Sequence, residues 1–229
     1  MSKKVALHNL GCKVNAYEVE AMQQLLEKAG YEIVPFTEGA DVYLINTCTV
    51  TNIADRKSRQ MLHKAKKMNP DAIVVAAGCY VQADTKKAEA DASIDIIIGN
   101  NKKQELIPIL ESYRTGHQKT TECVDINHTK EYENLEIDRT EEHTRAYLKV
   151  QDGCNQFCTY CIIPYARGRI RSKKTEDVVN EVKRLAASGC QEVVLTGIHL
   201  SSYGKERPED QENLLTLIQA VHQVDGIER

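Results

Sequence analysis

Three cysteines in one short stretch, Cys154, Cys158 and Cys161, are the residues best suited to chemistry in this sequence. Thiolates are soft ligands that favour iron–sulfur clusters and zinc. Structural zinc would need a fourth protein ligand nearby, but the next cysteine is Cys190 and the next histidine is His199. Three thiolates would leave one iron of a [4Fe–4S] cluster open to another ligand. We therefore expect an iron–sulfur site, with structural zinc as the alternative.

Three other cysteines occupy corresponding places in the first part of the chain. Cys12 follows the apolar run VALHNL, Cys48 follows DVYLINT, and Cys79 follows AIVVAAG. If these runs are parallel strands of one sheet, their carboxyl ends share the edge where ligands bind, and the three thiols can converge. Alternatively, each thiol is a small buried apolar group, because free cysteine is among the most buried residue types. The residues alone leave both possibilities open.

The composition is that of a soluble globular protein, with 41% hydrophobic residues, 28% charged residues and a mean hydropathy of -0.45. Its apolar runs are far shorter than the roughly 20 residues that cross a bilayer, and the N-terminus lacks a signal-peptide core. We expect a cytoplasmic protein with no membrane partner, in which the clustered cysteines among the eight serve metal or redox chemistry rather than disulfides. The net charge of -3 neither requires nor excludes a nucleic-acid partner.

Short apolar runs alternate with longer helical patterns over the first hundred residues, which is typical of an α/β fold. The runs are rich in Val, Ile and Ala, as strands covered on both faces should be. We therefore expect a doubly wound parallel sheet, within a first domain over residues 1–113. The expected strands lie at 5–10, 41–46, 72–78 and 94–99, and the expected helices at 16–29 and 53–68.

The pattern breaks down after residue 113, where an acidic stretch shows no sustained period. We expect a linker over 114–143, with one edge strand at 123–126. From residue 144 the β/α alternation resumes in a second domain over 144–229. Its expected strands are 146–153 and 192–197, and its expected helices are 175–188 and 213–224.

The spacing of Cys154, Cys158 and Cys161, with Tyr160 before the last cysteine, resembles the signature of the radical S-adenosylmethionine superfamily. That resemblance implies a partial, TIM-like β/α barrel in which the open iron binds S-adenosylmethionine and Tyr160 lies against its adenine. Reductive cleavage of this cofactor would give a 5′-deoxyadenosyl radical that abstracts hydrogen from carbon. Thr196 and Gly197 end a strand at the expected catalytic edge, where their backbone would contact S-adenosylmethionine, although any β/α turn also favours glycine.

Four motifs narrow the resemblance to the methylthiotransferases: LGCKVNAYE, NTCTVTNIAD, AAGCYVQ and CIIPYARGRIRS. The resemblance implies a second [4Fe–4S] cluster held by Cys12, Cys48 and Cys79, which would present sulfur to the substrate radical. Cys123 and Cys190 match no motif, and we expect both to pack in the interior. GCKVN, NTCTVTN and LTGIHLSSYG look like the branch that modifies N6-threonylcarbamoyladenosine in tRNA. Other branches modify isopentenyladenosine in tRNA or an aspartate of a ribosomal protein.

The implied partners are tRNA and an electron donor of the flavodoxin or ferredoxin type. The run from Arg167 to Lys174 carries five positive charges, which suits phosphate contacts, although such runs also occur as solvated surface. A second basic stretch, 56–67, is expected to be an exposed helix face. A non-catalytic iron–sulfur protein is the rival from another class.

The second domain looks incomplete by the standard of the family. Residues 147–229 have room for fewer than three β/α units at roughly 30 residues each. We therefore expect the chain to be part of a longer protein.

Overall fold

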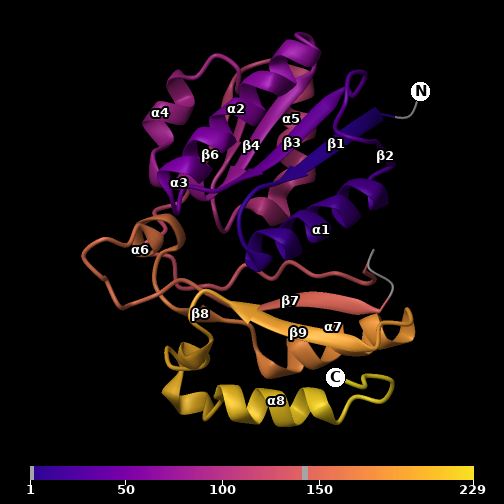
Figure 1. The fold of residues 1–229 in the computed structure, drawn as a ribbon, viewed down its shortest axis with the longest axis vertical. Helices are drawn as coiled ribbons and strands as arrows, with labels where there is room; N and C mark the ends of the chain where they lie inside the picture. Colours follow the sequence, from indigo (N-terminus) through magenta and orange to yellow (C-terminus); the bar gives the residue numbers. More distant parts are fainter. Residues whose placement is uncertain (1–2, 141–143) are drawn as a thin grey trace.

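The computed structural model describes residues 3–140 and 144–229 (Figure 1). The first part is built on a six-stranded sheet in which all neighbouring strands are parallel. The strand order is β2-β1-β3-β4-β5-β6, with β1 Lys3–Asn9, β2 Tyr31–Ile33, β3 Val42–Thr47, β4 Ile73–Gly78, β5 Ile96–Ile98 and β6 Thr120–Glu122. The parallel-sheet expectation is confirmed.

Helices cover both faces of this sheet, as the continuous apolar strands predict. On one face, Met22 and Leu26 of α1 (Lys13–Lys28) and Leu110 of α5 (Leu106–Gly116) pack on the sheet. On the other face, Leu62 of α2 (Asn52–Met68) and Val81 of α3 (Cys79–Ala83) share a second core. The short helix α4 (Thr85–Ala90) and the 3-10 turn η1 (Lys103–Glu105) complete this part. Every residue of β3 is buried, because both of its faces are covered.

The second part carries a smaller sheet of order β8-β7-β9, with β7 Arg145–Asp152, β8 Arg171–Ser172 and β9 Glu192–Gly197. β7 and β9 are parallel, and the helix α7 (Thr175–Ala187) lies between them in the chain, as a β/α unit requires. β8 pairs antiparallel with β7, which the sequence did not indicate. The remaining elements are α6 Ile163–Arg167, η2 Leu200–Ser202, η3 Pro208–Asp210 and α8 Leu214–His222.

The two parts share a core between them. Tyr17 and Ala21 of α1 belong to the same cluster of buried side chains as Leu148 of β7, Val182 of α7 and Leu217 of α8. Figure 1 shows α1 on one side of the second sheet and α7 and α8 on the other. The second sheet is therefore covered on one face by a helix of the first part.

The acidic stretch is not a free tether, which corrects the expectation of a linker over 114–143. Residues 114–116 belong to α5, the edge strand is β6 at 120–122 rather than 123–126, and residues 141–143 lie outside the described residues. Leu135 and Ile137 are only 2% and 0% exposed in the shared core. Because they alternate with acidic residues, an extended backbone turns both apolar side chains inward and the charged ones outward.

Within residues 3–140 and 144–229, no helix is long and apolar enough to cross a lipid bilayer.

Candidate metal and cofactor site

The loop after β7 carries Cys154, Cys158 and Cys161, and its backbone is fixed at both ends. Gly153 precedes the first cysteine with a φ of +71°, and a Cβ there would lie 1.9 Å from the carbonyl oxygen of Arg169. The amide of Cys154 donates to the carbonyl of Gly168 at 3.0 Å, and the amide of Cys161 donates to that of Cys158 at 2.9 Å. The Cys158 side chain is exposed and the other two are partly exposed. This loop thus presents three accessible thiols.

Cys12, Cys48 and Cys79 follow the carboxyl ends of three neighbouring strands, β1, β3 and β4. Cys12 is exposed, whereas Cys48 and Cys79 are buried. A Cβ on Gly11 would lie 3.1 Å from the Cβ of Cys48, so the segment that carries Cys12 passes directly beside Cys48. The structure therefore places these three cysteines at one edge of the first sheet, as the strand order requires.

Asparagine side chains surround this first group of cysteines. Asn15 donates to the carbonyls of Leu10 and Thr47 at 2.7 and 3.1 Å, which ties the ends of β1 and β3 together. Asn100 lies with its Nδ2 3.6 Å from the Sγ of Cys79. Burial raises the pKa of the Cys79 thiol, and this effect exceeds the opposite effect of the nearby Arg167 charge. The motif LGCKVNAYE includes Asn15, but Asn100 had no sequence signal.

The two groups of cysteines are neighbours in space. α3 begins at Cys79 and packs against α6, which begins two residues after Cys161. Asn100 links the two directly, since the same Nδ2 that faces Cys79 donates to the carbonyl of Ala166 at 2.6 Å. Figure 1 shows α6 beneath α3 at the junction of the two parts.

The donor set suits iron–sulfur clusters better than a single metal ion. All eight cysteines are free thiols. Over the described ranges, no three His, Cys, Asp or Glu side chains lie close enough together to hold one ion. A cubane cluster binds each thiolate to a different iron and so spaces its ligands more widely than one ion does. The three thiols of each group are thus donors of the soft kind that iron–sulfur clusters use.

The expected cofactor-binding residues occupy different environments. Tyr160 lies on the cysteine loop with its side chain 92% exposed, so its ring is free to stack on a planar ligand. Thr196 and Gly197 end β9 beside β7, at the same edge of the sheet as the cysteine loop. Thr196 is buried, and a Cβ on Gly197 would lie 2.9 Å from the Cβ of Gln151. Close packing against Gln151 thus explains why a glycine occupies position 197, whether or not a cofactor binds there.

The expectation that the run from Arg167 to Lys174 forms a phosphate-binding surface is wrong for three of its five positive residues. Arg167, Arg171 and Lys173 are each 1% exposed. Only Arg169 and Lys174 are exposed, and the Arg169 guanidinium lies 4.3 Å from the centre of the Phe157 ring. Sequence spacing alone did not reveal this, because Glu18, Asp152 and Glu181, the carboxylates that pair with the buried residues, have no regular spacing from them in the chain.

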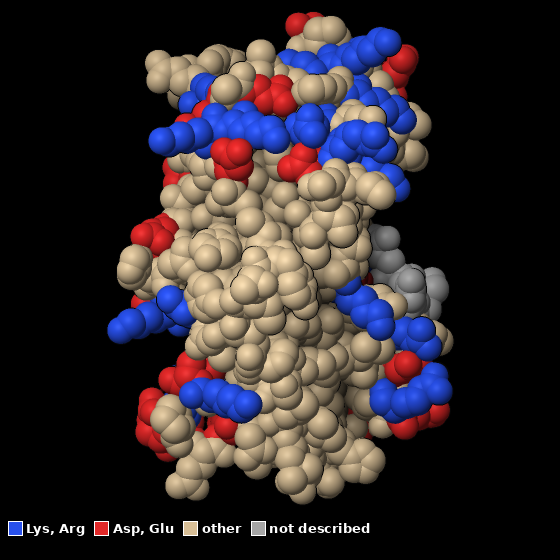
Figure 2. Space-filling view, turned by 60° about the vertical axis from the view of Figure 1, so that its left-hand side comes forward, with Lys and Arg blue, Asp and Glu red and all other residues tan. Residues whose placement is uncertain are grey.

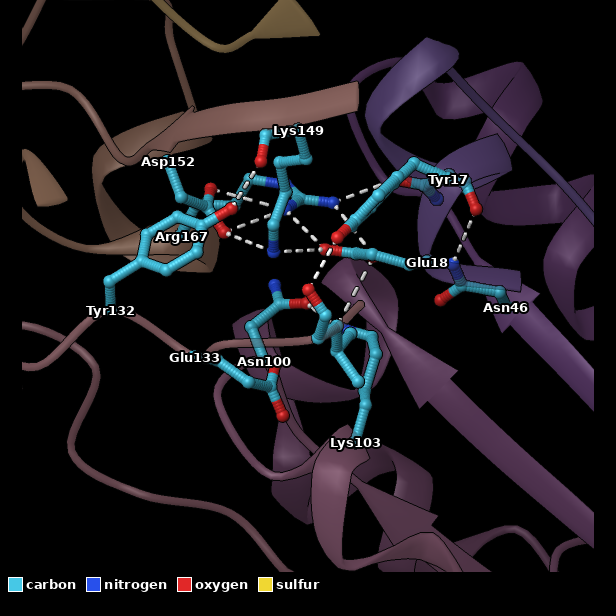
Figure 3. A network of polar contacts seen from close by, with 12 residues as sticks. Tyr17, Glu18, Asn46, Asn100, Lys103, Tyr132, Glu133, Lys149, Asp152 and Arg167 are labelled. Carbon is cyan, nitrogen blue, oxygen red and sulfur yellow. Dashed lines mark hydrogen bonds and ion pairs between the residues drawn. The ribbon is translucent and has the colours of Figure 1, made fainter. Parts of the chain in front are cut away.

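Arg167 lies at the centre of a buried ionic network between the two parts (Figure 3). Its Nη1 lies 2.9 Å from Glu18 of α1 and 3.0 Å from Asp152 of β7. Lys103 and Lys149 also pair with Glu18, at 3.3 and 3.2 Å. Burial alone would raise the pKa of Glu18, but the three positive charges outweigh it and hold that pKa well below its ordinary value. The carboxylates of Glu18 and Asp152 are therefore both ionised at neutral pH.

The pKa of Asp152 is set by the same opposing effects as the pKa of Glu18. Its burial would raise the pKa of its carboxyl, yet the charges of Arg167, Lys149 and Arg171 lower that pKa. Asp152 also accepts a hydrogen bond from the amide of Gly153 at 2.8 Å, immediately before the first cysteine of the loop. The network thus extends to the start of the cysteine loop.

The exposed basic residues lie instead on the first part. Figure 2 shows Lys and Arg side chains gathered over the upper part of the molecule, whereas the middle of this face is largely uncharged. On α2 the basic stretch is an exposed face, as expected, although Arg59 and Lys66 pair with Asp55 and Asp95. The exposed members are Arg56, Lys57, Lys64 and Lys67 of α2, with Lys86 and Lys87 of α4.

Comparison with known proteins agrees with this division of the cysteines. Residues 4–99, which include the first group, match the model of Uncharacterized protein family UPF0004. Residues 148–225, which include the second group, match the model of the Radical SAM superfamily. The chain thus combines a UPF0004 region with a radical SAM region.

The proteins that this chain resembles in sequence carry two different names. The chain is 42% identical to a threonylcarbamoyladenosine tRNA methylthiotransferase MtaB of Bacillus subtilis and 45% identical to one of Aquifex aeolicus, over 98% of the chain in each case. It is 33% identical, over 97% of the chain, to a tRNA-2-methylthio-N(6)-dimethylallyladenosine synthase of Clostridium beijerinckii. These alignments cover 50%, 54% and 50% of the relatives. The chain thus spans about half the length of the relatives it matches.

A solved structure shows a similar fold at low sequence identity. The radical S-adenosylmethionine methyltransferase TsrM of Kitasatospora setae superposes with a TM-score of 0.59 over 94% of this chain and 53% of that protein, at 16% identity. At this identity the likeness concerns the fold alone.

Proposed function

We propose that this chain is part of a tRNA methylthiotransferase that adds a methylthio group to carbon 2 of N6-threonylcarbamoyladenosine beside the anticodon. One observation carries the proposal: the chain is 42–45% identical, over 98% of its length, to proteins named for this reaction. Identity to the dimethylallyladenosine synthases is 33–36%, and three further relatives of the first name lie at 35–37%. In this proposal residues 1–113 and 144–229 are its two domains, and 114–143 joins them while contributing Leu135 and Ile137 to the core that they share.

Each group of three thiols holds one [4Fe–4S] cluster in this proposal. Cys154, Cys158 and Cys161 are accessible, as a cluster that must also bind S-adenosylmethionine requires. Cys12, Cys48 and Cys79 hold the second cluster, the one that presents sulfur. When bound, the first cluster and S-adenosylmethionine supply the radical that removes hydrogen from the substrate carbon.

The residues of the chain contribute binding and positioning. The exposed ring of Tyr160 stacks on the adenine of S-adenosylmethionine, and the backbone of Thr196 and Gly197 contacts the same cofactor at the end of β9. The exposed lysines and arginines of α2 and α4, with Arg169 and Lys174, contact tRNA phosphates. The reaction takes place in the cytoplasm and draws electrons from a donor of the flavodoxin or ferredoxin type.

Nucleoside mass spectrometry of tRNA tests the substrate. Cells that lack the gene of the full-length parent protein should lose 2-methylthio-N6-threonylcarbamoyladenosine and regain it when the wild-type gene is restored. A Cys158→Ala gene should not restore it, whereas a Cys190→Ala gene should, because Cys190 is buried behind β9 and belongs to neither group. Loss of the methylthio derivative of isopentenyladenosine instead would assign the chain to the other tRNA branch, and intact tRNA nucleosides would point to the ribosomal protein.

A non-catalytic iron–sulfur protein makes a different spectroscopic prediction. A pure electron carrier needs no open iron, so S-adenosylmethionine should leave the electron paramagnetic resonance spectrum of its reduced cluster unchanged. The proposal requires that the spectrum change on addition of S-adenosylmethionine, and that the change be absent in the Cys158→Ala protein.

A further inference from the structure

Arg167 joins the two parts of the molecule through a single guanidinium group. Its Nη1 lies 2.9 Å from Glu18 Oε1 on α1 and 3.0 Å from Asp152 Oδ2 on β7. Its Nη2 donates to Asn15 Oδ1, also on α1, at 2.7 Å. The side chain is 1% exposed, so water does not compete for these contacts. The buried guanidinium group of Arg167 therefore joins α6 to α1 in the first part and to β7 in the second (Figure 3).

The partners of α6 in turn hold the segments of the first cysteine group. Asn15, whose Oδ1 faces both Arg167 and the Cys12 thiol, fixes the backbone before Cys12 and before Cys48. Asn100 bridges the carbonyl of Ala166 on α6 and the thiol of Cys79, and Lys103 holds Asn100 at 2.6 Å. All three cysteines of the first group are thus within one or two contacts of α6.

The second cysteine group is tied to the same short helix. The amide of Cys154 donates to the carbonyl of Gly168, the residue that follows Arg167. At the other end of the loop, Cys161 precedes the first residue of α6 by two positions. A Cβ on Gly168 would lie 2.0 Å from the carbonyl oxygen of Ile126, so the two backbones pack closely there. Both ends of the cysteine loop are thus joined to α6 or to the residue that follows it.

We propose that Arg167 is a positioning residue that sets the distance between the two cysteine groups, and hence between the metal centres that they hold. Arginine suits this role because its planar fork reaches a carboxylate and an amide at once, whereas a lysine presents one point charge. The side-chain hydrogen bonds of Arg167 go to Glu18, Asp152 and Asn15, so it acts on the cysteine segments through these residues. That this distance matters for sulfur transfer rests on the proposed function. That Arg167 positions the two cysteine groups does not depend on the proposed function.

Hydrogen exchange of the full-length parent protein tests the positioning. In Arg167→Lys we expect the amides of 154–168 to exchange at least about tenfold faster, because α6 opens locally without unfolding of the whole chain. Exchange in α7 should stay unchanged. Arg184→Lys is the matched control, since Arg184 pairs with Glu136 on a half-exposed surface, and it should leave 154–168 as in the wild type. Unchanged exchange of 154–168 in Arg167→Lys, or equal acceleration of 154–168 and α7, would overturn the inference.

Electron paramagnetic resonance supplies a readout that a purely structural role would not move. In the reconstituted parent protein, two reduced clusters broaden each other's signals by a dipolar coupling that falls steeply with distance. Arg167→Lys should keep the wild-type iron content but weaken this coupling, whereas Arg184→Lys should match the wild type. Undiminished coupling in Arg167→Lys would contradict the inference. A wild-type protein that forms no methylthio product would instead refute the proposed function and leave the exchange result standing.

Discussion

Gly153 shows how a single residue fixes the entry to the cysteine loop. Its φ of +71° lies in the left-handed region, where a side chain costs about 1–2 kcal/mol. A Cβ there would also meet the carbonyl oxygen of Arg169 at 1.9 Å. We predict that Gly153→Ala lowers the free energy of unfolding by more than about 2 kcal/mol, as measured by urea denaturation, because backbone strain and a backbone clash add together.

Gly189→Ala is the control for this change. Gly189 has a φ of +96°, but no atom lies within 4 Å of an added Cβ. The control should lower the free energy of unfolding by only the cost of the left-handed backbone, about 1–2 kcal/mol. Equal losses in the two variants would show that the contact with Arg169 does not constrain the loop.

Glu18 predicts how acid affects stability at the junction of the two parts. Its pKa is lower in the folded protein than in the unfolded chain, so its contribution is complete above about pH 4.3 and disappears as the pH falls through the folded value. Glu18→Gln removes the negative charge that pairs with the buried Arg167, Lys103 and Lys149. We predict that it lowers the free energy of unfolding by about 3–5 kcal/mol at pH 7.

The same variant should differ less from the wild type in acid. When urea denaturation is measured between pH 7 and pH 3, the difference in free energy of unfolding between the wild type and Glu18→Gln should decrease below about pH 4.3. Glu111→Gln, which removes a surface partner of Lys3, should change stability by less than about 1 kcal/mol. A gap for Glu18→Gln that stays constant with pH would contradict the assignment of an ionised, buried carboxylate.

Among individual residues, the six cysteines could be singled out from the sequence because their types and spacing carry the signal. Arg167 could not be placed correctly, since an isolated run of positive charge is most simply a surface. Its burial depends on Glu18, which lies 149 positions earlier in the chain. Only the folded arrangement brings those two charges together.

At the scale of elements, the segment before the second sheet is the clearest test of the fold. Leu135 is 2% exposed in the core shared by the two parts, although the acidic sequence around it indicates a linker. We predict that Leu135→Ala lowers the free energy of unfolding by about 2–5 kcal/mol, because it leaves a cavity in a packed core.

Leu215→Ala offers a matched comparison, because Leu215 is 62% exposed on α8. Leu215→Ala should change the free energy of unfolding by no more than about 0.5 kcal/mol in the same urea denaturation. If Leu135→Ala costs no more than this control, the segment does not belong to the core.

Elements with a continuous apolar pattern were predictable, whereas short or mixed ones were not. The expected strand at 192–197 coincides with β9, and α7 ends one residue before its expected end. β2 has only three residues and β8 only two, too few for any period to show. α5, which covers one face of the first sheet, was not predicted from the sequence.

At the scale of the whole molecule, the account requires two independent metal sites on one chain. We predict that the parent protein in which Cys154, Cys158 and Cys161 are all replaced by Ala keeps about four irons after anaerobic reconstitution, since three thiolates remain for one [4Fe–4S] cluster. Iron analysis with far-ultraviolet circular dichroism measures this. Loss of all iron from a folded variant, or no loss, would contradict the two-site arrangement.

The relation between the two sites was not predictable from sequence. Strand order alone favours convergence of Cys12, Cys48 and Cys79 at one sheet edge. That this edge faces the loop of Cys154 depends on α6, a five-residue helix, and on contacts of Asn100 and Arg167 between the two parts. Such contacts join residues with no regular spacing in the chain.

The division of work between the two cysteine groups is tested most directly by comparing Cys48→Ala with Cys158→Ala in the full-length parent protein. Both variants must first be shown to fold, because a cluster also contributes to folding. We predict that Cys48→Ala forms no methylthio product on tRNA but still cleaves S-adenosylmethionine to 5′-deoxyadenosine, whereas Cys158→Ala does neither. A folded Cys48→Ala protein that makes 2-methylthio-N6-threonylcarbamoyladenosine at the wild-type rate would contradict it.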